Sequence, residues 1–161
     1  HQLHITPQSK VVTAGKSEDA RRCNHCNHRY DVAYCLFRSI HCVCANTDIL
    51  LIGTSSGAFY YSTQYHAFMP CEALGRSTNW GQVNCIKWAN GIFIIGGAEL
   101  RFSLDGKQCW TVNTEINQCI FMDAVYKDNY WLVCSTPMGS VTSTSGVYYM
   151  KGQNLQLPVY L

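Results

Sequence analysis

The sequence predicts an all-β fold of β-propeller type, built from four-stranded repeats of about 40 residues. Three observations predict it: short apolar runs bounded by small-residue turns, a regular spacing between these runs, and the lack of apolar residues at helical spacing. A β-sandwich without repeats is the alternative, because short strands and glycine turns are common to both architectures. The chain is therefore expected to consist of strands almost throughout.

Three stretches share one plan of polar turn, apolar run, small-residue turn and a second strand that ends near a serine. These stretches are 45–64, 89–106 and 127–146. Ser62 and Ser103 are 41 residues apart, Ser103 and Ser143 are 40 apart, and Gly53 and Gly96 are 43 apart. Such a period is typical of propeller blades.

Each repeat is also expected to have a first strand before this unit and a fourth strand after it. The first strands are expected at 40–45, 83–88 and 121–126. The fourth strand is clearest at 108–113, and the closing segment 154–161 suits an edge strand because Pro158 cannot donate to a ladder. The repeats are assigned to residues 36–161.

Composition limits the classes of function. The 161 residues are 47% hydrophobic and 14% charged, which suits one domain with an apolar core. The net charge of +2 comes from scattered residues, so no nucleic-acid partner is predicted. The longest apolar runs, 49–53 and 92–97, are far shorter than the roughly 20 residues that span a bilayer, so no membrane insertion is predicted.

One hairpin in the second repeat carries a known motif. The stretch SLDGKQCW contains Ser103, Asp105, Gly106 and Trp110. It resembles the Asp-box (BNR-like) hairpin found in sialidase-type β-propellers and in many phage tail and fibre proteins. It differs in having glycine directly after the aspartate and Cys109 where the family usually has threonine.

The resemblance implies a structural role for this hairpin. The aspartate is expected to accept hydrogen bonds from turn amides, and Gly106 to adopt a positive φ. Trp110 is expected to pack between adjacent blades. The other two copies are weaker, since 62–68 lacks both Asp and Gly, and 143–149 keeps Ser and Gly with Tyr148 in the aromatic position.

The amino-terminal segment 1–35 is rich in cysteine and histidine and is either a separate segment or a degenerate first blade. Cys23 and Cys26 have C-x-x-C spacing, and His28 and Cys35 are near enough to complete a tetrahedral shell. A structural zinc ion is therefore the one cofactor predicted. A local disulfide and free thiols are the alternatives, and the ten cysteines of the chain are expected to be mostly reduced.

The resemblance to sialidases also raises a divergent glycoside hydrolase as a hypothesis. Enzymes of that family grip a carboxylate with three arginines, but Arg38, Arg76 and Arg101 do not lie in matching contexts. The spacing of the glutamates nominates no pair of catalytic carboxylates. The sequence therefore predicts no catalytic residue and no enzymatic activity.

Aromatic residues are dense, and alternate strand positions point to opposite faces. Four are candidates for contacts with a ligand or partner: Tyr60, Tyr65, Trp131 and Tyr148. Exposed Tyr and Trp favour protein contacts or sugar stacking, whereas packing between blades would explain them equally well.

The predicted function is a non-catalytic structural or binding module. By resemblance it is expected to be a component of a virion appendage such as a phage tail, nozzle or fibre, located in the virion and able to contact a host surface. Its expected partners are proteins, as a homo- or hetero-oligomer or as the remainder of a larger chain, and in addition a glycan. A stand-alone carbohydrate-binding propeller is the alternative, and a secreted location stays open.

Overall fold

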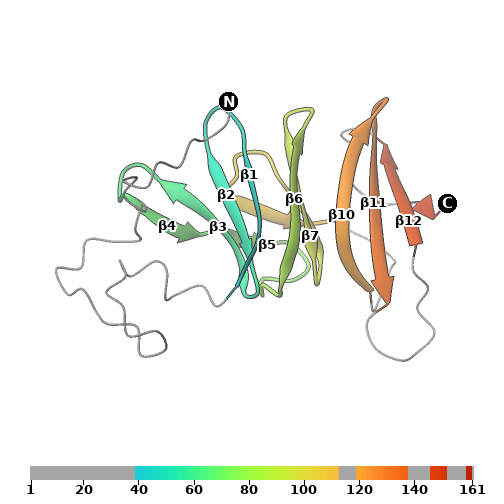
Figure 1. Cartoon of the computed structure of the whole chain (residues 1–161), viewed down its shortest axis with the longest axis horizontal. Coiled ribbons are helices and arrows are strands. Elements are labelled where there is room, and N and C mark those ends of the chain that lie inside the picture. The colour runs from blue at the N-terminus through green and yellow to red at the C-terminus, as the bar shows by residue number, and fades with distance from the viewer. Residues whose placement is uncertain (1–38, 113–118, 138–145, 152–158, 161) are drawn as a thin grey trace, which may run out of the picture.

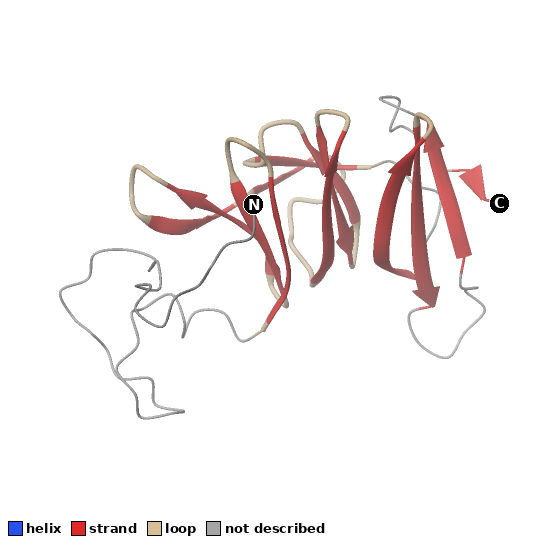
Figure 2. Cartoon of the chain, turned by 45° about the horizontal axis from the view of Figure 1, so that its top comes forward, coloured by secondary structure: helices blue, strands red, loops and turns tan. Residues whose placement is uncertain are grey.

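The computed structural model describes residues 39–112, 119–137, 146–151 and 159–160. Every regular element in these ranges is a β-strand, so the predicted all-β class is confirmed (Figure 2). Over the same ranges, no helix has the length and apolar character needed to cross a membrane. The strands form three sheets, and none of these sheets closes into a barrel.

Each sheet contains a four-stranded antiparallel meander in chain order. The first sheet consists of β1 (Ile40–Ala45), β2 (Leu50–Thr54), β3 (Gly57–Ser62) and β4 (Ala67–Pro70). The second consists of β6 (Val83–Ala89), β7 (Ile92–Gly97), β8 (Leu100–Ser103) and β9 (Gln108–Thr111), and the third of β10 (Cys119–Lys127), β11 (Tyr130–Pro137), β12 (Gly146–Lys151) and β13 (Val159–Tyr160). An additional strand that the sequence did not suggest, β5 (Glu72–Leu74), pairs in parallel with β9.

Two of the hairpins between first and second strands are closed by the same kind of turn. Asn90 and Gly91 join β6 to β7 with φ of 49° and 74°, and Asp128 and Asn129 join β10 to β11 with φ of 51° and 67°. Positive φ at both central residues defines the type I′ turn, which Asn, Asp and Gly adopt most readily. In the first sheet a longer loop is closed instead by the Asn46 side chain, whose oxygen accepts from two backbone N–H groups.

The three sheets are equivalent residue by residue around a β-bulge. The first strand of each sheet has an irregularity in its register against the second strand, at Ile40/Cys42, Val83/Cys85 and Phe121/Asp123. The residues that pair with the last member of each bulge are Gly53, Gly96 and Cys134. The internal repeat is therefore visible as a shared bulge position.

The second sheet lies between the other two, and both of its faces are buried (Figure 1). Phe93 and Ile95 of β7 belong to the core shared with the first sheet, whereas Ile94 belongs to the core shared with the third. This double burial explains why β7 reads as a continuous apolar run instead of an alternating one. The layered packing fits a sandwich-like all-β fold.

The predicted positions of the strands are correct for the first two repeats and need one correction in the third. Ser62 and Ser103 end β3 and β8, as the alignment of repeats requires. The corresponding third strand of the third sheet, β12, begins only at Gly146, so Ser143 does not end it and lies outside the described residues. The expected edge strand within 154–161 is present as β13, the last strand of its sheet.

The described cysteines are free thiols, as the sequence predicts, and all of them except Cys71 lie within strands: Cys42, Cys44, Cys71, Cys85, Cys109, Cys119 and Cys134. Burial raises the pKa of Cys42 to about 11 and that of Cys85 to about 12. These thiols are therefore uncharged at neutral pH and act as small apolar core residues.

Candidate functional site

The hairpin between β8 and β9 is closed by a compact set of hydrogen bonds. The buried Ser103 hydroxyl accepts from the Gly106 N–H at 2.8 Å and donates to Asp105 Oδ1 at 3.2 Å. The same Asp105 oxygen accepts from the N–H groups of Lys107 and Gln108, both at 2.8 Å. Gly106 adopts a φ of 75°. One carboxylate oxygen thus satisfies two turn amides and one hydroxyl.

The hairpin also packs against the first sheet. A Cβ atom on Gly106 would lie 2.9 Å from Ile49 and 3.1 Å from Leu51, so the backbone approaches this sheet too closely for a side chain. The Cys71 thiol donates to the Gly106 carbonyl at 3.4 Å, and the Lys107 ammonium lies 5.4 Å from the centre of the Tyr60 ring. The turn therefore serves to join the first two sheets.

The electrostatics of the hairpin favour an ionised Asp105. Partial burial would raise the pKa of this carboxyl, but hydrogen bonds from Gln108, Lys107 and Ser103 lower it below its ordinary value. Each of these donors forms a hydrogen bond to the carboxylate, which favours its charged form. The Asp105 carboxylate therefore serves to stabilise the turn.

The expected packing of Trp110 between sheets is wrong. Its side chain is 44% exposed, whereas the neighbouring Cys109 is fully buried in the core between the first two sheets. Successive residues of a strand point to opposite faces, so only one of the two can enter this core. The smaller Cys109 takes that position.

The four aromatic contact candidates lie in different surroundings. Tyr65 is 58% exposed in the turn between β3 and β4, and Tyr60 is partly buried beside Lys107. Trp131 is fully buried and packs on Tyr126 with ring centroids 5.2 Å apart, so its proposed role as a surface contact is wrong. Tyr148 pairs with Val133 through the backbone, and its side chain lies outside the described part of the structure.

The predicted zinc ligands Cys23, Cys26, His28 and Cys35 lie outside the described residues, so the zinc site stays a prediction. Within the described ranges no group of three or more His, Cys, Asp or Glu residues could hold a metal ion.

A buried arginine is the main polar feature that the sequence did not reveal as such. The Arg101 guanidinium donates to the carbonyl oxygens of Leu74, Ser77 and Asn79 at 3.0–3.2 Å. It also donates to Thr111 at 3.0 Å and to the Glu99 carboxylate at 2.6 Å.

Arg101 is therefore a structural residue of the second sheet. Burial lowers the pKa of its guanidinium, and the charge of Glu99 opposes this effect. Its charge centre also lies 4.8 Å from the centre of the Trp80 ring. Because the donors of Arg101 hold the loop after β5, this residue is unsuited to binding the carboxylate of a sialidase-type substrate. Arg38, which the glycoside hydrolase hypothesis also considered, lies outside the described residues.

The outer face of the first sheet exposes apolar side chains at positions that are buried elsewhere. Ile40 and Val43 of β1 are 53% and 66% exposed. The equivalent residues of the other two first strands, counted from the bulge, are 2–6% exposed: Val83 and Ile86 in β6, and Phe121 and Ala124 in β10. These equivalents are covered by the preceding sheet, and the first sheet has no preceding sheet among the described residues.

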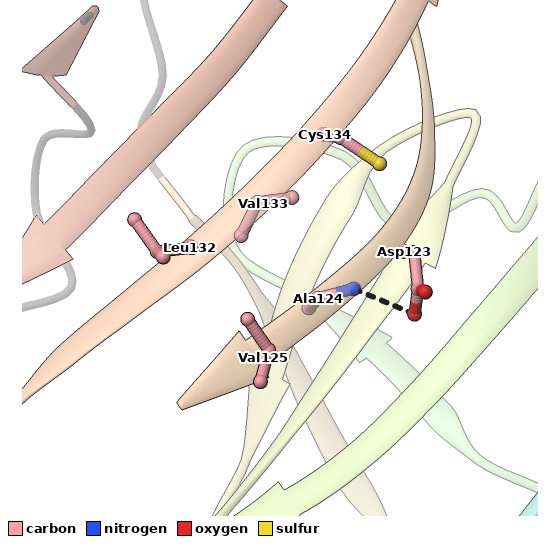
Figure 3. A pocket seen from close by; sticks show the side chains of 6 residues that line it. All are labelled: Asp123, Ala124, Val125, Leu132, Val133 and Cys134. Atoms are coloured by element: carbon pink, nitrogen blue, oxygen red, sulfur yellow. Dashed lines mark hydrogen bonds between the residues drawn. The ribbon is translucent and has the colours of Figure 1, made fainter. Parts of the chain in front are cut away.

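The outer face of the third sheet is apolar and hollowed. Met122 and Val125 of β10 are 42% and 56% exposed. A depression of about 250 Å³ lies between β10 and β11 (Figure 3), and its lining consists of Asp123, Ala124, Val125, Leu132, Val133 and Cys134. Both ends of the stack of sheets therefore present apolar surface.

No protein-family model and no curated protein matches this chain. The main polar features of the described residues are the hairpin and the buried arginine, and both have structural roles. Asp105 closes the turn of the hairpin, which contacts Cys71, and Arg101 holds the loop after β5. The outer faces are the surfaces through which the described part of the molecule can act on another.

Proposed function

We propose that the chain is a non-catalytic structural module made of β-propeller-like blades, which acts by assembling with protein partners. The observation that carries this proposal is the exposure of Ile40 and Val43 at positions that are buried by sheet packing in both other repeats. Apolar side chains exposed together on one face are typical of protein-association sites. The module thus has surfaces suited to neighbours at both ends.

Two features support blades in preference to a sandwich. A sandwich packs two sheets, whereas here the middle sheet packs on both faces. The first strands also follow one another, with β6 in contact with both β1 and β10, as the innermost strands of successive blades would be (Figure 1). The described sheets number fewer than the four blades of the smallest usual propeller, so a closed ring needs further sheets.

Equivalent side chains bridge the successive first strands. His41 Nδ1 lies 2.9 Å from the carbonyl oxygen of Val83, and Asn84 Nδ2 donates to the carbonyl oxygen of Phe121 at 3.2 Å. His41 and Asn84 each lie directly before the second bulge residue of their strand, and both acceptors are the first bulge residue of the next sheet. A repeated contact of this kind supports a regular, blade-like succession of sheets.

The virion setting is proposed from the resemblance of the Ser103–Trp110 hairpin to those of phage tail and fibre proteins, in which such blades form assemblies. Quantitative mass spectrometry of particles, banded from cells that express the gene naturally, tests this setting. The proposal expects the chain in the particle fraction at a constant ratio to the other particle proteins. Recovery of the chain only in the soluble fraction would contradict it.

A further inference from the structure

We propose that the outer face of the third sheet binds the outer face of the first sheet of a second copy of this chain, head to tail. The inference rests on the proposed function, since it names the partner of an assembling module. The three sheets are equivalent to one another around their bulges. The two outer faces are then two halves of an interface that already occurs twice inside the chain.

Each sheet has a forward face, toward the next sheet in the chain, and a backward face, toward the preceding one. Leu51 and Ile94, two residues before Gly53 and Gly96, are buried on the forward faces of the first and second sheets. The equivalent residue of the third sheet is Leu132, which lines the hollow. The hollow therefore lies where a following sheet would pack.

The internal interfaces show which residue enters this position. A Cβ atom on Gly53 would lie 3.1 Å from Cβ of Val83, and one on Gly96 would lie 3.1 Å from Cβ of Phe121. In both cases the first bulge residue of the following sheet sits on the glycine. The residue equivalent to Val83 and Phe121 at the free backward face is Ile40, which is 53% exposed.

The third sheet has a different residue at this contact. Cys134 replaces the glycine and lines the hollow of about 250 Å³ (Figure 3). Because Cys134 carries the Cβ atom that both glycines lack, Ile40 of a second copy must lie farther from this strand than Val83 lies from Gly53. The hollow beside Cys134 is the place where the Ile40 side chain can then pack.

The ion pair of the second interface has no counterpart at the outer faces. In that interface, Lys87 and Asp123 form an ion pair at 3.4 Å. Val125 stands at the position of Lys87 in the third sheet, and Cys42, which packs with the core toward the second sheet, stands at the position of Asp123 in the first. Neither free face therefore presents a lone half of this ion pair.

We identify the occupant as a second copy because a forward face packs on a backward face inside the chain, and the free faces are one of each. One copy offers a free forward face and a free backward face, and its neighbour supplies the counterpart of each. Such a head-to-tail contact closes into a ring when the rotation that relates one copy to the next brings the last copy back to the first. The described sheets of two copies number six, within the usual four to eight blades of a propeller.

Two charge substitutions test the pairing in the full chain. Val43→Asp blocks the backward face and Val125→Asp blocks the forward face, and both residues are largely exposed in the single chain, so folding is unaffected. Light scattering after size exclusion at about 50 µM, far above the Kd of a stable interface, should show a wild-type dimer. Each variant alone should be a monomer, because one uncompensated buried charge raises the Kd roughly a hundredfold or more.

An equimolar mixture of the two variants should dimerise again. The Val43→Asp chain keeps a working forward face and the Val125→Asp chain keeps a working backward face, so one interface is intact. Leu104→Asp is the matched control, because Leu104 is 67% exposed in the hairpin turn, on neither outer face, and this variant should remain a dimer.

A wild-type monomer at this concentration would overturn the proposal, whether the faces are covered by residues 1–35, by further repeats of a longer chain or by another protein. A dimer of Val125→Asp alone would also overturn it, since the contact would then join two first sheets symmetrically. The particle measurement under the proposed function is independent of both results. A chain found in particles but monomeric in isolation would contradict only the head-to-tail pairing.

Discussion

At the residue scale, single polar side chains determine how loops are attached to the sheets. Asp105 closes one turn with one carboxylate oxygen, and Arg101 holds the loop after β5 through three carbonyl groups. The motif around Asp105 could be identified in the sequence because its residues are consecutive. The role of Arg101 could not, since its acceptors lie 22 to 27 residues away in an irregular loop.

Asp105→Asn tests the carboxylate by the pH dependence of stability. The folded pKa of Asp105 is lowered, so its stabilisation is fully present above the unfolded pKa of about 3.9 and is lost as pH falls through the folded value. At pH 7 the variant should lose about 1 kcal/mol in free energy of unfolding. This loss should shrink toward zero near pH 2, as measured by urea unfolding. The exposed Asp48→Asn serves as control, and a loss that does not change with pH would contradict the assignment.

Arg101→Met tests the hydrogen bonds that the buried Arg101 guanidinium makes to the loop after β5 and to Glu99. The Asn79 carbonyl oxygen and the Glu99 carboxylate would lose their Arg101 donor, and the carbonyl oxygens of Leu74 and Ser77 would keep only the Thr111 hydroxyl. The free energy of unfolding should therefore fall by about 3–5 kcal/mol. Arg101→Lys should recover less than half of this loss, because one ammonium cannot replace a planar fork of donors. Urea unfolding of both variants, beside the exposed Lys127→Met, provides the measurement. If Arg101→Met lowers the free energy of unfolding by less than about 1 kcal/mol, Arg101 does not have the structural role assigned to it.

At the element scale, the sequence predicts strands better than the direction in which their side chains point. The first strands at 40–45, 83–88 and 121–126 were placed correctly, because short apolar runs between turn residues are a local signal. The choice between neighbouring faces was wrong for Trp110 and Trp131. Burial there depends on which sheet packs on which face, and a strand buried on both faces carries no alternating pattern to show it.

The alignment of the third repeat failed for a related physical reason. Serine residues recur by chance in turn-rich stretches, so Ser143 gave a good spacing at a position that β12 does not reach. The bulge is a more specific marker, but it consists of hydrogen-bond register and is invisible in residue types such as Cys42, Cys85 and Asp123.

Gly96→Ala tests the sheet-to-sheet contact at the bulge. The added methyl group would lie 2.8 Å from Cys85 Sγ and 3.1 Å from Cβ of Phe121, so the free energy of unfolding should fall by about 1–3 kcal/mol. Thermal and urea unfolding provide the measurement, with Gly91→Asn as control because Gly91 faces open space and Asn tolerates a positive φ. An unchanged stability of Gly96→Ala would contradict the close packing of the second and third sheets.

At the scale of the whole molecule, the sheets form a series that the described residues leave open at both ends. The middle sheet is covered by a neighbouring sheet on each face, and every residue of β7 is buried. The outer sheets repeat its positions with exposed apolar residues, which are Ile40 and Val43 at one end and Met122 and Val125 at the other. The proposed assembly would cover these outer faces as the chain covers the equivalent surfaces of its two internal interfaces, and removing apolar surface from water is stabilising.

The central claim is that position 40 of one copy lies over Cys134 of another, as Val83 lies over Gly53 and Phe121 over Gly96. Ile40→Cys tests it directly. A Cβ atom on Gly53 or Gly96 would lie within 3.1 Å of the Cβ that faces it, so two cysteines at the equivalent positions come within reach of a disulfide, whose Cβ atoms lie about 3.5–4.5 Å apart. Mild oxidation followed by mass spectrometry of non-reduced peptides should identify an intermolecular disulfide between position 40 and Cys134, and the additional Cys134→Ser change should abolish it. A disulfide that joins position 40 of one copy to position 40 of the other, or no intermolecular disulfide at all, would contradict the head-to-tail account.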